Sequence, residues 1–341
     1  MGLRVGVLFG GLSAEHEISC LSAKNIYKAL LETPHTPVLI GIDRQGLWHL
    51  TDDSFTFGQG ISLSEAVSKI LPKIDVAFPI FHGPYGEDGS FQGFLEILGI
   101  PYAGAGVLAS AVGMDKDVMK RLLQNAGIPV ADFLTFSRPP NFADVKAKLG
   151  LPLFIKPVTM GSSIGISRVT TEEEFIRGVE DAFQYDSRII IEREVKGREI
   201  ECSVLGGSPP TASLPGEFVP KGGVYTYEMK YLDPEGAAFY LPAPLSASTT
   251  AAVQSLAIKA FEVLATDGMA RVDFFVDKGE KLYINEINTI PGFTPISLYP
   301  KLWELSGLST PKLVERLIEL GVERSLRKKS LSLEPNPHAY N

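Results

Sequence analysis

The N-terminal part of the chain alternates short apolar runs with segments that have the apolar spacing of a helix. A short apolar run bounded by turn residues predicts a buried strand, whereas apolar residues three or four apart predict one face of a helix. Strands that alternate with helices favour a parallel sheet with helices on its faces. We therefore expect a Rossmann-like α/β domain over residues 1–105. Its strands are predicted within residues 3–11, 36–43 and 74–83, and its helices within residues 15–32 and 62–71.

The middle of the chain changes to a mixed α and β pattern. A helix is predicted over residues 114–127, because Asp115 is a favourable N-cap and Gly127 a favourable stop. The pattern indicates an α+β domain over residues 106–205. Its strands are predicted within residues 128–136, 151–169 and 188–206, and a further helix over residues 171–183.

The C-terminal part begins with a stretch that is dense in glycine and proline. Residues 214–244 read as a long functional loop or lid, because long loops in compact domains often serve a site. The final helix is expected to start at Thr310 and Pro311, since proline is favoured in the first turn. A further helix is predicted over residues 249–265. These elements form a predicted third domain over residues 206–330, which is followed by a tail over residues 331–341.

Polar side chains interrupt an apolar hairpin that joins "ARVDFFV" to "YINEINTIPG" through the turn "DKGE". Residues two apart along a strand share a face, so Arg271 and Asp273 lie together. Glu286 and Asn288 lie together on the other strand for the same reason. Mg²⁺ prefers carboxylate and amide oxygens completed by substrate phosphates. Asp273, Glu286 and Asn288 therefore form a candidate metal site, the alternative being acids on a surface strand.

A loop rich in glycine and serine follows a lysine on an apolar strand in "FIKPVTMGSSIG". The amides of this loop and the hydroxyls of Ser162 and Ser163 can wrap phosphate oxygens next to Lys156, although an ordinary hairpin turn would look similar. In "IIEREVKGRE", Glu192 and Glu199 lie on predicted strands that flank a turn. They suit an adenine amino group and ribose hydroxyls, or they face solvent.

Three other nucleotide-binding patterns fit the chain poorly. "FGGLSAEHEIS" lacks the Lys-Ser/Thr ending of a P-loop. "GAGVLA", from Gly104, matches a dinucleotide fingerprint but follows no clear strand, which makes a dehydrogenase a weak alternative. A protein kinase has its glycine-rich loop before the strand lysine and needs "HRD" and "DFG", which this sequence lacks.

Composition and charge narrow the class of protein further. A net charge of −8 offers no overall cationic field for nucleic acid. Cys20 and Cys202 are far apart and lack metal-ligand spacing, which favours reduced thiols and a cytoplasmic location. No apolar run approaches the roughly 18 residues of a membrane-spanning helix. We expect a protein that binds neither nucleic acid nor membrane.

Seven short motifs occur in a fixed order along the chain: "GGLSAEHEIS", "FHGPYGEDGSFQG", "GMDK", "FIKPVTMGSSIG", "YEMKY", "ARVDFF" and "NEINTIPGFTPISLYP". Together they resemble the D-alanine–D-alanine ligases of the ATP-grasp superfamily over nearly the whole chain. The resemblance implies an ATP-grasp fold with an N-terminal pre-ATP-grasp domain, and a homodimer. It implies ATP-dependent joining of two D-alanines through an acyl phosphate, giving ADP and phosphate, for peptidoglycan synthesis.

The resemblance also implies roles for single residues. ATP would contact Lys116, Lys156, Ser162, Ser163, Glu192, Val195 and Glu199. Mg²⁺, with Mn²⁺ as a substitute, would be held by Asp273, Glu286 and Asn288. D-Alanine and its reaction centre would involve Glu15, His82, Lys230, Tyr231, Arg271, Gly292, Ser297 and Leu298.

Among the substrate residues, Glu15 would fix the amino group of the first D-alanine, with His82 nearby. Arg271 and the amide of Gly292 would stabilise the oxyanion. Lys230, Ser297 and the amide of Leu298 would hold the second carboxylate. A hydrogen-bonded link of Tyr231, Ser162 and Glu15 would close the lid.

The implied chemistry explains these residue types. A carboxylate is a poor electrophile, so it must first be phosphorylated, and cations must offset its repulsion from the γ-phosphate. An acyl phosphate hydrolyses in water, which gives a reason for a lid. Two alternatives remain at this stage: a D-alanine–D-lactate ligase, whose known forms lack a tyrosine at the position of Tyr231, and a non-catalytic ATP-grasp nucleotide sensor.

Overall fold

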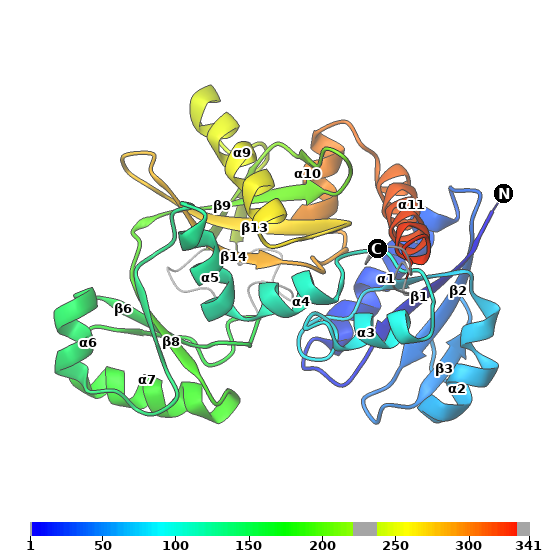
Figure 1. The fold of residues 1–341 in the computed structure, drawn as a ribbon, viewed down its shortest axis with the longest axis horizontal. Helices are drawn as coiled ribbons and strands as arrows, with labels where there is room; N and C mark the ends of the chain where they lie inside the picture. The colour runs from blue at the N-terminus through cyan, green and yellow to red at the C-terminus, as the bar shows by residue number, and fades with distance from the viewer. Residues whose placement is uncertain (1, 221–236, 333–341) are drawn as a thin grey trace, which may run out of the picture.

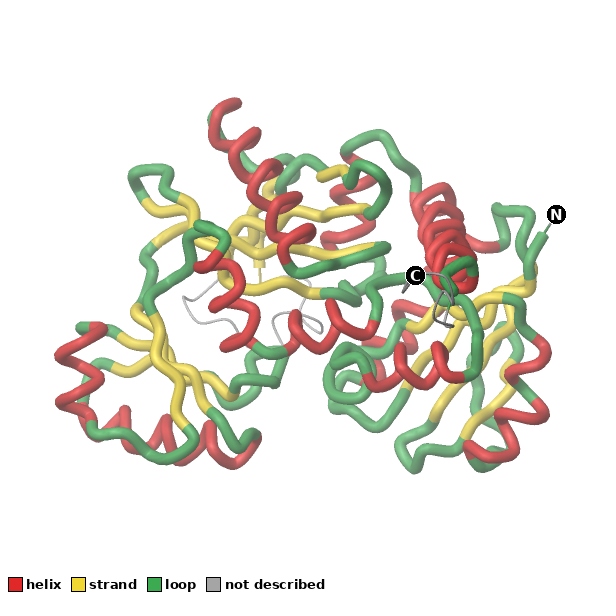
Figure 2. The backbone as a smooth tube through the Cα atoms, viewed as in Figure 1, coloured by secondary structure: helices red, strands yellow, loops and turns green. Residues whose placement is uncertain are grey.

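The computed structural model describes residues 2–220 and 237–332 (Figure 1). In these ranges the strands form an N-terminal sheet of four strands, a large sheet of six and a central sheet of four. The N-terminal sheet lies at one end of the molecule, the central sheet at the other, and the large sheet between them (Figure 1). Helices pack around all three sheets (Figure 2). The mixed α and β character agrees with the prediction.

The N-terminal sheet contains the predicted apolar runs and one further strand. Its strands, in the order β3-β2-β1-β4, are β1 Arg4–Gly10, β2 Thr36–Ile42, β3 Trp48–Thr51 and β4 Val76–Pro79. β1 is parallel to β2 and to β4, as predicted. β3 is antiparallel to β2, so the expectation of a wholly parallel sheet is wrong at this edge. The connection from Ile42 to Trp48 is too short for the crossover of a dozen or more residues that a parallel return needs.

Side chains of β1 alternate between two apolar cores. Val5, Val7 and Phe9 share one core with residues of α1 and α11, whereas Leu8 belongs to the core on the other face. The helices around this sheet are α1 His16–Leu30, α2 Leu63–Lys69, the short 3₁₀ helix Leu71–Lys73, α3 Ser90–Ile97 and α11 Thr310–Lys329. α11 begins at the predicted residue but covers the N-terminal sheet. The same core contains residues of α10 (Leu298–Leu305), so α11 contacts elements of both the first and the third predicted domain.

The central sheet is antiparallel throughout and carries two helices on one face (Figure 1). Its strands, in the order β5-β8-β6-β7, are β5 Phe133–Phe136, β6 Leu153–Pro157, β7 Ser167–Val169 and β8 Ile189–Arg193, and its helices are α6 Phe142–Leu149 and α7 Glu172–Tyr185. The hydroxyl of Thr171 and the carboxylate of Glu174 form a capping box that fixes the start of α7. Ile155, Phe175 and Ile191 pack in the core between sheet and helices.

The large sheet has the order β12-β11-β9-β13-β14, with β10 paired to β9. Its elements are β9 Gly197–Leu205, β10 Thr211–Ala212, β11 Gly216–Pro220, β12 Ala237–Tyr240, α9 Ala247–Val263, β13 Met269–Asp277, β14 Leu282–Asn288 and α10 Leu298–Leu305. The predicted hairpin of β13 and β14 is confirmed. β8 and β9 belong to different sheets, so the expected turn between Glu192 and Glu199 is instead a link from one sheet to another.

Two short helices connect the N-terminal sheet to the rest of the molecule. α4 Val107–Met114 follows an isolated bridge between Ala77 and Tyr102, so "GAGVLA" does not follow a strand of the sheet. α5 Lys116–Asn125 has the predicted N-cap, because the side chain of Asp115 accepts a hydrogen bond from the amide of Val118. α5 lies between the large and the central sheet (Figure 1).

The segment predicted as a loop or lid, residues 214–244, is only partly described. β11 and β12 lie within it and pair antiparallel, so the expectation of an irregular loop is wrong at both ends. The aromatic rings of Phe218 and Phe239 pack across this pair at a centroid distance of 5.5 Å, and such cross-strand contacts stabilise a sheet despite nearby glycine and proline. Lys230 and Tyr231 lie outside the described residues.

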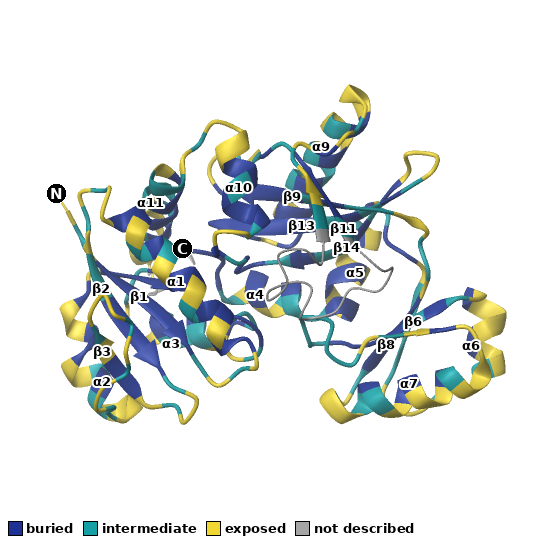
Figure 3. Ribbon diagram, turned by 180° about the vertical axis from the view of Figure 1, so that it is seen from behind, coloured by how far each residue is buried: buried dark blue, intermediate teal, exposed yellow. Residues whose placement is uncertain are grey.

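The distribution of buried residues matches the positions of the sheets. Buried residues concentrate on the strands and on the helix faces toward them, and exposed residues lie on the outer faces of α6, α7 and α9 (Figure 3). None of the helices in the described ranges combines the length and the apolar character that a bilayer crossing demands.

Candidate active site

Two adjoining cavities contain most of the predicted site residues. The larger has a volume of about 370 Å³ and the smaller a volume of about 60 Å³. Both are lined by Lys116, Gly161, Ser162 and Glu286. A group bound in one cavity therefore lies close to a group bound in the other.

The larger cavity lies where the central sheet meets the large sheet. Lys156 and Glu192 line it from β6 and β8, and Glu199 and Asp273 line it from β9 and β13. Val195, in the link between β8 and β9, lines it as well. Apolar side chains complete its wall, namely Phe154, Ile166, Ile200, Phe274 and Phe275. An apolar slot with charged groups along its edges suits a nucleotide, whose base is flat and whose phosphates are charged.

A buried cluster of opposite charges forms part of this wall. The Nζ atom of Lys156 lies 2.6 Å from Oε2 of Glu192, and the Nζ atom of Lys120 lies 2.8 Å from Oε1. Burial by itself would raise the pKa of Glu192, but the charges and hydrogen bonds of both lysines hold it at about 2. Burial would lower the pKa of Lys156, but Glu192 raises it above its ordinary value. Glu192 and Lys156 therefore both stay charged at neutral pH.

Three carboxylates form a row across the large sheet. In the strand register, Asp273 lies opposite Glu201 of β9 and opposite Glu286 of β14. Arg271 offsets part of this negative charge, because it donates to both oxygens of Asp273 at 2.7 and 2.6 Å and lies 2.8 Å from Glu201. Asn288 lies opposite Arg271 in the register. The predicted convergence of these strands is confirmed.

The predicted metal ligands fit a hard divalent cation. Asp273 and Glu286 carry carboxylates at facing strand positions, and Asn288 carries an amide two residues along β14, whose Oδ1 accepts a hydrogen bond from the amide of Ile290. In the described ranges, no group of three or more His, Cys, Asp or Glu side chains is placed to hold a metal ion. Two carboxylates and an amide still suit a metal ion whose remaining ligands are phosphate and water oxygens.

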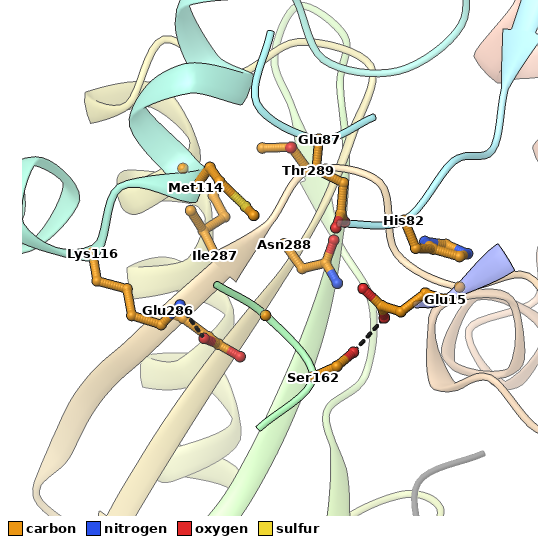
Figure 4. Close-up of a pocket in the computed structure, with 13 residues that line it drawn as sticks. Glu15, His82, Glu87, Met114, Lys116, Ser162, Glu286, Ile287, Asn288 and Thr289 are labelled. Atoms are coloured by element: carbon orange, nitrogen blue, oxygen red, sulfur yellow. Dashed lines mark hydrogen bonds and ion pairs between the residues drawn. The ribbon is translucent and has the colours of Figure 1, made fainter. Parts of the chain in front are cut away.

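The smaller cavity collects side chains from loops that are distant in sequence (Figure 4). The hydroxyl of Ser162 donates a hydrogen bond to Oε1 of Glu15, and His82 lies beside Glu15 (Figure 4). The buried hydroxyl of Ser22 lies 3.4 Å from Nε2 of His82 and accepts a hydrogen bond from the amide of Phe293 at 3.1 Å. Ser22 thereby joins α1 to the loops that follow β4 and β14.

Ser162 and Ser163, in the loop rich in glycine and serine, have an unusual backbone conformation. Ser162 and Ser163 have φ values of 52° and 60°, the left-handed region that residues with a Cβ seldom adopt. Such strain often accumulates at functional sites. Ser162 lines both cavities, whereas Ser163 lines the larger one only.

The start of α10 lies next to the smaller cavity. Ser297 precedes this helix, and its hydroxyl accepts a hydrogen bond from the amide of Thr294 at 3.0 Å. A side chain added at Gly292 would place its Cβ 2.8 Å from that hydroxyl, so the hydroxyl would have to shift. The amide of Leu298 lies in the first turn of α10, where amide groups favour an anion such as a carboxylate.

Comparison with known proteins identifies the family. A model described as the D-ala D-ala ligase N-terminus matches residues 4–105, and one described as the D-ala D-ala ligase C-terminus matches residues 122–319. The D-alanine–D-alanine ligase of Shouchella clausii is 46% identical over 96% of this chain and 97% of its own length. The chain belongs to the D-alanine–D-alanine ligase family. D-Alanine–D-alanine ligase A of Escherichia coli K12 is also 46% identical, over 94% of this chain and 96% of its own.

Solved structures of D-alanine–D-alanine ligases and related enzymes have the same fold. The D-alanine–D-alanine ligase from Coxiella burnetii superposes with a TM-score of 0.83 at 40% identity and covers 96% of each chain. The VanG D-Ala:D-Ser ligase from Enterococcus faecalis has a TM-score of 0.84 at 33% identity, over 94% of this chain and 100% of its own. The predicted ATP-grasp fold with an N-terminal Rossmann-like domain is confirmed.

The sequence predicted no role for some of the residues that line the two cavities. Glu87 and Thr289 line the smaller cavity, and Glu201 lines the larger one. The motifs "FHGPYGEDGSFQG" and "NEINTIPGFTPISLYP" contain Glu87 and Thr289, which was the available signal. Nothing in the sequence distinguishes Lys120 from other helix lysines, because its partner Glu192 is far away in the chain.

Proposed function

We infer that this chain joins two D-alanines into D-alanyl-D-alanine with ATP, releasing ADP and phosphate, and so supplies peptidoglycan synthesis. The observation that carries this function is the contact between the two cavities at Lys116, Ser162 and Glu286. A γ-phosphate bound in the larger cavity there meets a carboxylate bound in the smaller one. The family membership supports the same activity, since relatives at 46% identity have that name.

In this proposal the chain's own residues position and stabilise the reactants. Glu15 accepts a hydrogen bond from the amino group of the first D-alanine, and its link to Ser162 holds the serine loop over the cavity. Lys116 points toward Glu286, with 3.7 Å between Nζ and Oε2, and offsets negative charge where phosphate and carboxylate meet (Figure 4). Arg271 and the amide of Gly292 stabilise the oxyanion.

The second D-alanine completes the reaction. Its amino group attacks the acyl phosphate carbonyl and expels phosphate, while Ser297 and the amide of Leu298 bind its carboxylate. Lys230 and Tyr231 are proposed to assist from the segment outside the described residues. Enclosing the acyl phosphate away from water favours the amine as nucleophile.

We propose that the divalent ion is Mg²⁺, with Mn²⁺ as a substitute, held by Asp273, Glu286 and Asn288. When bound, this ion supplies charge stabilisation for the phosphoryl transfer. We also propose a cytoplasmic homodimer that binds neither nucleic acid nor membrane. The cytoplasm supplies ATP, and the motif resemblance supports the dimer, which light scattering of the purified chain would test.

ADP and phosphate release, measured with each acceptor in turn, tests the function. We expect release to require D-alanine and a divalent ion, with little release on L-alanine. D-Lactate or D-serine should not replace the second D-alanine at neutral pH; if either did so equally well, the substrate assignment would be wrong. Full-rate hydrolysis without any amino acid would contradict a ligase, and nucleotide binding without turnover would favour a sensor.

A further inference from the structure

A fully buried lysine lies behind the larger cavity, one helical turn after Lys116 on α5. Lys120 is only 1% exposed, and its ammonium group pairs with Oε1 of Glu192. Lys156, which lines the cavity, pairs with the other oxygen of the same carboxylate. Lys120 does not line the cavity itself. Its direct contact with the wall of the cavity is therefore the ion pair with Glu192.

The position of Lys120 links the two sheets that form the cavity. Met119 and Leu123, its neighbours on α5, pack in the core of the large sheet. Glu192 lies on β8 of the central sheet. The ion pair thus joins α5, which packs on the large sheet, to a strand of the central sheet.

Charge balance alone does not explain this lysine. Burying an ammonium group costs several kcal/mol unless it is well paired, and burial lowers the pKa of Lys120 although Glu192 opposes this. Lys156 alone already neutralises Glu192. The additional effect of Lys120 is on the orientation and ionisation of the carboxylate.

A carboxylate held at both oxygens presents its remaining lone pairs in a fixed direction. Lys156 donates a hydrogen bond to Oε2 and Lys120 forms an ion pair with Oε1, so a cation lies against each oxygen. Glu192 lines the cavity and its Oε1 is fully buried, so Oε2 is the oxygen left to accept from a ligand there. An ionised carboxylate accepts a hydrogen bond from the 6-amino group of adenine, but it repels the 6-oxo oxygen of guanine or hypoxanthine.

We propose that Lys120 is a positioning residue for nucleotide selection, which fixes Glu192 as the acceptor that favours a 6-aminopurine over a 6-oxopurine. The proposal rests on the proposed function in taking ATP as the nucleotide of the larger cavity. It assigns to Lys120 an effect on nucleotide affinity and preference, and little effect on the reaction rate once nucleotide is bound.

Lys120→Met tests the proposal because it removes the charge, keeps the length and leaves Lys156 and Glu192 as a neutral pair. Binding of ATP and of inosine triphosphate, its 6-oxo counterpart, is measured by calorimetry with Mg²⁺ and without D-alanine. We expect the Kd for ATP to rise about tenfold, since a hydrogen bond to a charged group is commonly worth that much or more. The Kd for inosine triphosphate should change less than about twofold, and kcat at saturating ATP less than about threefold.

Two further variants separate positioning from general stability. Lys120→Arg keeps the cation and should restore most of the preference for ATP. Arg121→Met removes the next cation on α5, an exposed arginine paired with Asp117, and should leave the preference unchanged. Thermal unfolding of each variant shows whether it is folded, and Lys120→Gln replaces Lys120→Met if the latter is not.

A double variant tests the route through Glu192. Glu192→Gln should itself reduce the preference, and adding Lys120→Met should reduce it no further. Equal losses of affinity for both nucleotides in Lys120→Met would overturn the proposal, as would a further loss of preference in the double variant. Because binding is measured without ligation, a chain that prefers ATP through Lys120 but makes no D-alanyl-D-alanine would refute the proposed function and leave this inference intact.

Discussion

The two cavities share a wall but are built in different ways. The larger one takes most of its charged side chains from regular strands of two sheets, where register places each group. The smaller one takes Glu15, His82 and Ser162 from loops and a helix start (Figure 4). Gly292 lines it from the loop after β14, beside the end of that strand. Strands fix direction through their hydrogen-bond ladders, whereas loops depend on a few side-chain contacts.

The difference in construction suits the two cavities to binding different substrates. Paired charges on strands can hold nucleotide phosphates and metal in a geometry that exists before binding. The hydrogen bond between Ser162 and Glu15 joins the serine loop to the N-terminal domain, so it can respond to the amino acid. We expect substitutions in the strand-built wall to affect turnover and stability most, and those in the loop-built wall to affect D-alanine binding.

The largest effect is expected at the shared wall, from Glu286→Gln. Removing one carboxylate charge from the metal ligands should lower kcat by about a hundredfold to a thousandfold and weaken the apparent affinity for Mg²⁺. ADP release at saturating ATP and D-alanine, titrated with Mg²⁺, measures both. Asp277→Asn is the control, because this acid at the far end of β13 accepts only from turn amides. Near-normal turnover of a folded Glu286→Gln would remove this residue from the metal site.

The next effect concerns stability and pH at Glu192. Its folded pKa is about 2 against an ordinary 4.5, so its ion pairs stabilise the fold above pH 4.5, and this stabilisation is lost as the pH falls toward 2. Glu192→Gln should lower the free energy of unfolding at pH 7 by on the order of 3 kcal/mol. Urea unfolding at pH 7 and at pH 3 measures the difference, which should narrow at the lower pH. A difference that did not depend on pH would contradict this link between the pKa of Glu192 and stability. Glu65→Gln, which removes an exposed ion pair with Lys69, is the control.

The two serines of one loop offer a direct contrast between the cavities. Ser162→Ala removes the link to Glu15 and should raise the KM for D-alanine about tenfold. Ser163 lines only the larger cavity, so Ser163→Ala should raise the KM for ATP and leave that for D-alanine unchanged. Steady-state kinetics with each substrate varied in turn measures both KM values. If both variants changed both KM values equally, the two serines would not act on separate cavities.

The smallest effect is expected from Gly292→Ala. The added methyl group meets the hydroxyl of Ser297 at 2.8 Å and displaces it. We expect the displaced hydroxyl to lose about 1 kcal/mol of substrate binding, the low end of the cost of overpacking, which raises the KM for D-alanine roughly fivefold. Gly58→Ala is the control because open space surrounds that position. An unchanged KM for D-alanine would show that Ser297 moves freely and does not hold the substrate.

Local sequence patterns predicted the elements whose contacts are close in the chain. The hairpin of β13 and β14 and the cap of α5 at Asp115 depend on neighbouring residues, and both are confirmed. The antiparallel edge strand β3 was not predicted, and β8 with β9 was expected as a hairpin. A period of two shows that a segment is a strand but does not show which strand it pairs with.

The sequence by itself determined the family, through seven ordered motifs, and the gathering of Asp273, Glu286 and Asn288 on the hairpin of β13 and β14. Only the tertiary structure decided that Lys120 pairs with Glu192, that Ser162 contacts Glu15, and that α11 covers the N-terminal sheet. The physical reason is how far apart in the chain the interacting residues are. The ladder of a hairpin and the cap of a helix join residues that are near in the chain, whereas buried ion pairs and apolar cores join any segments that packing brings together.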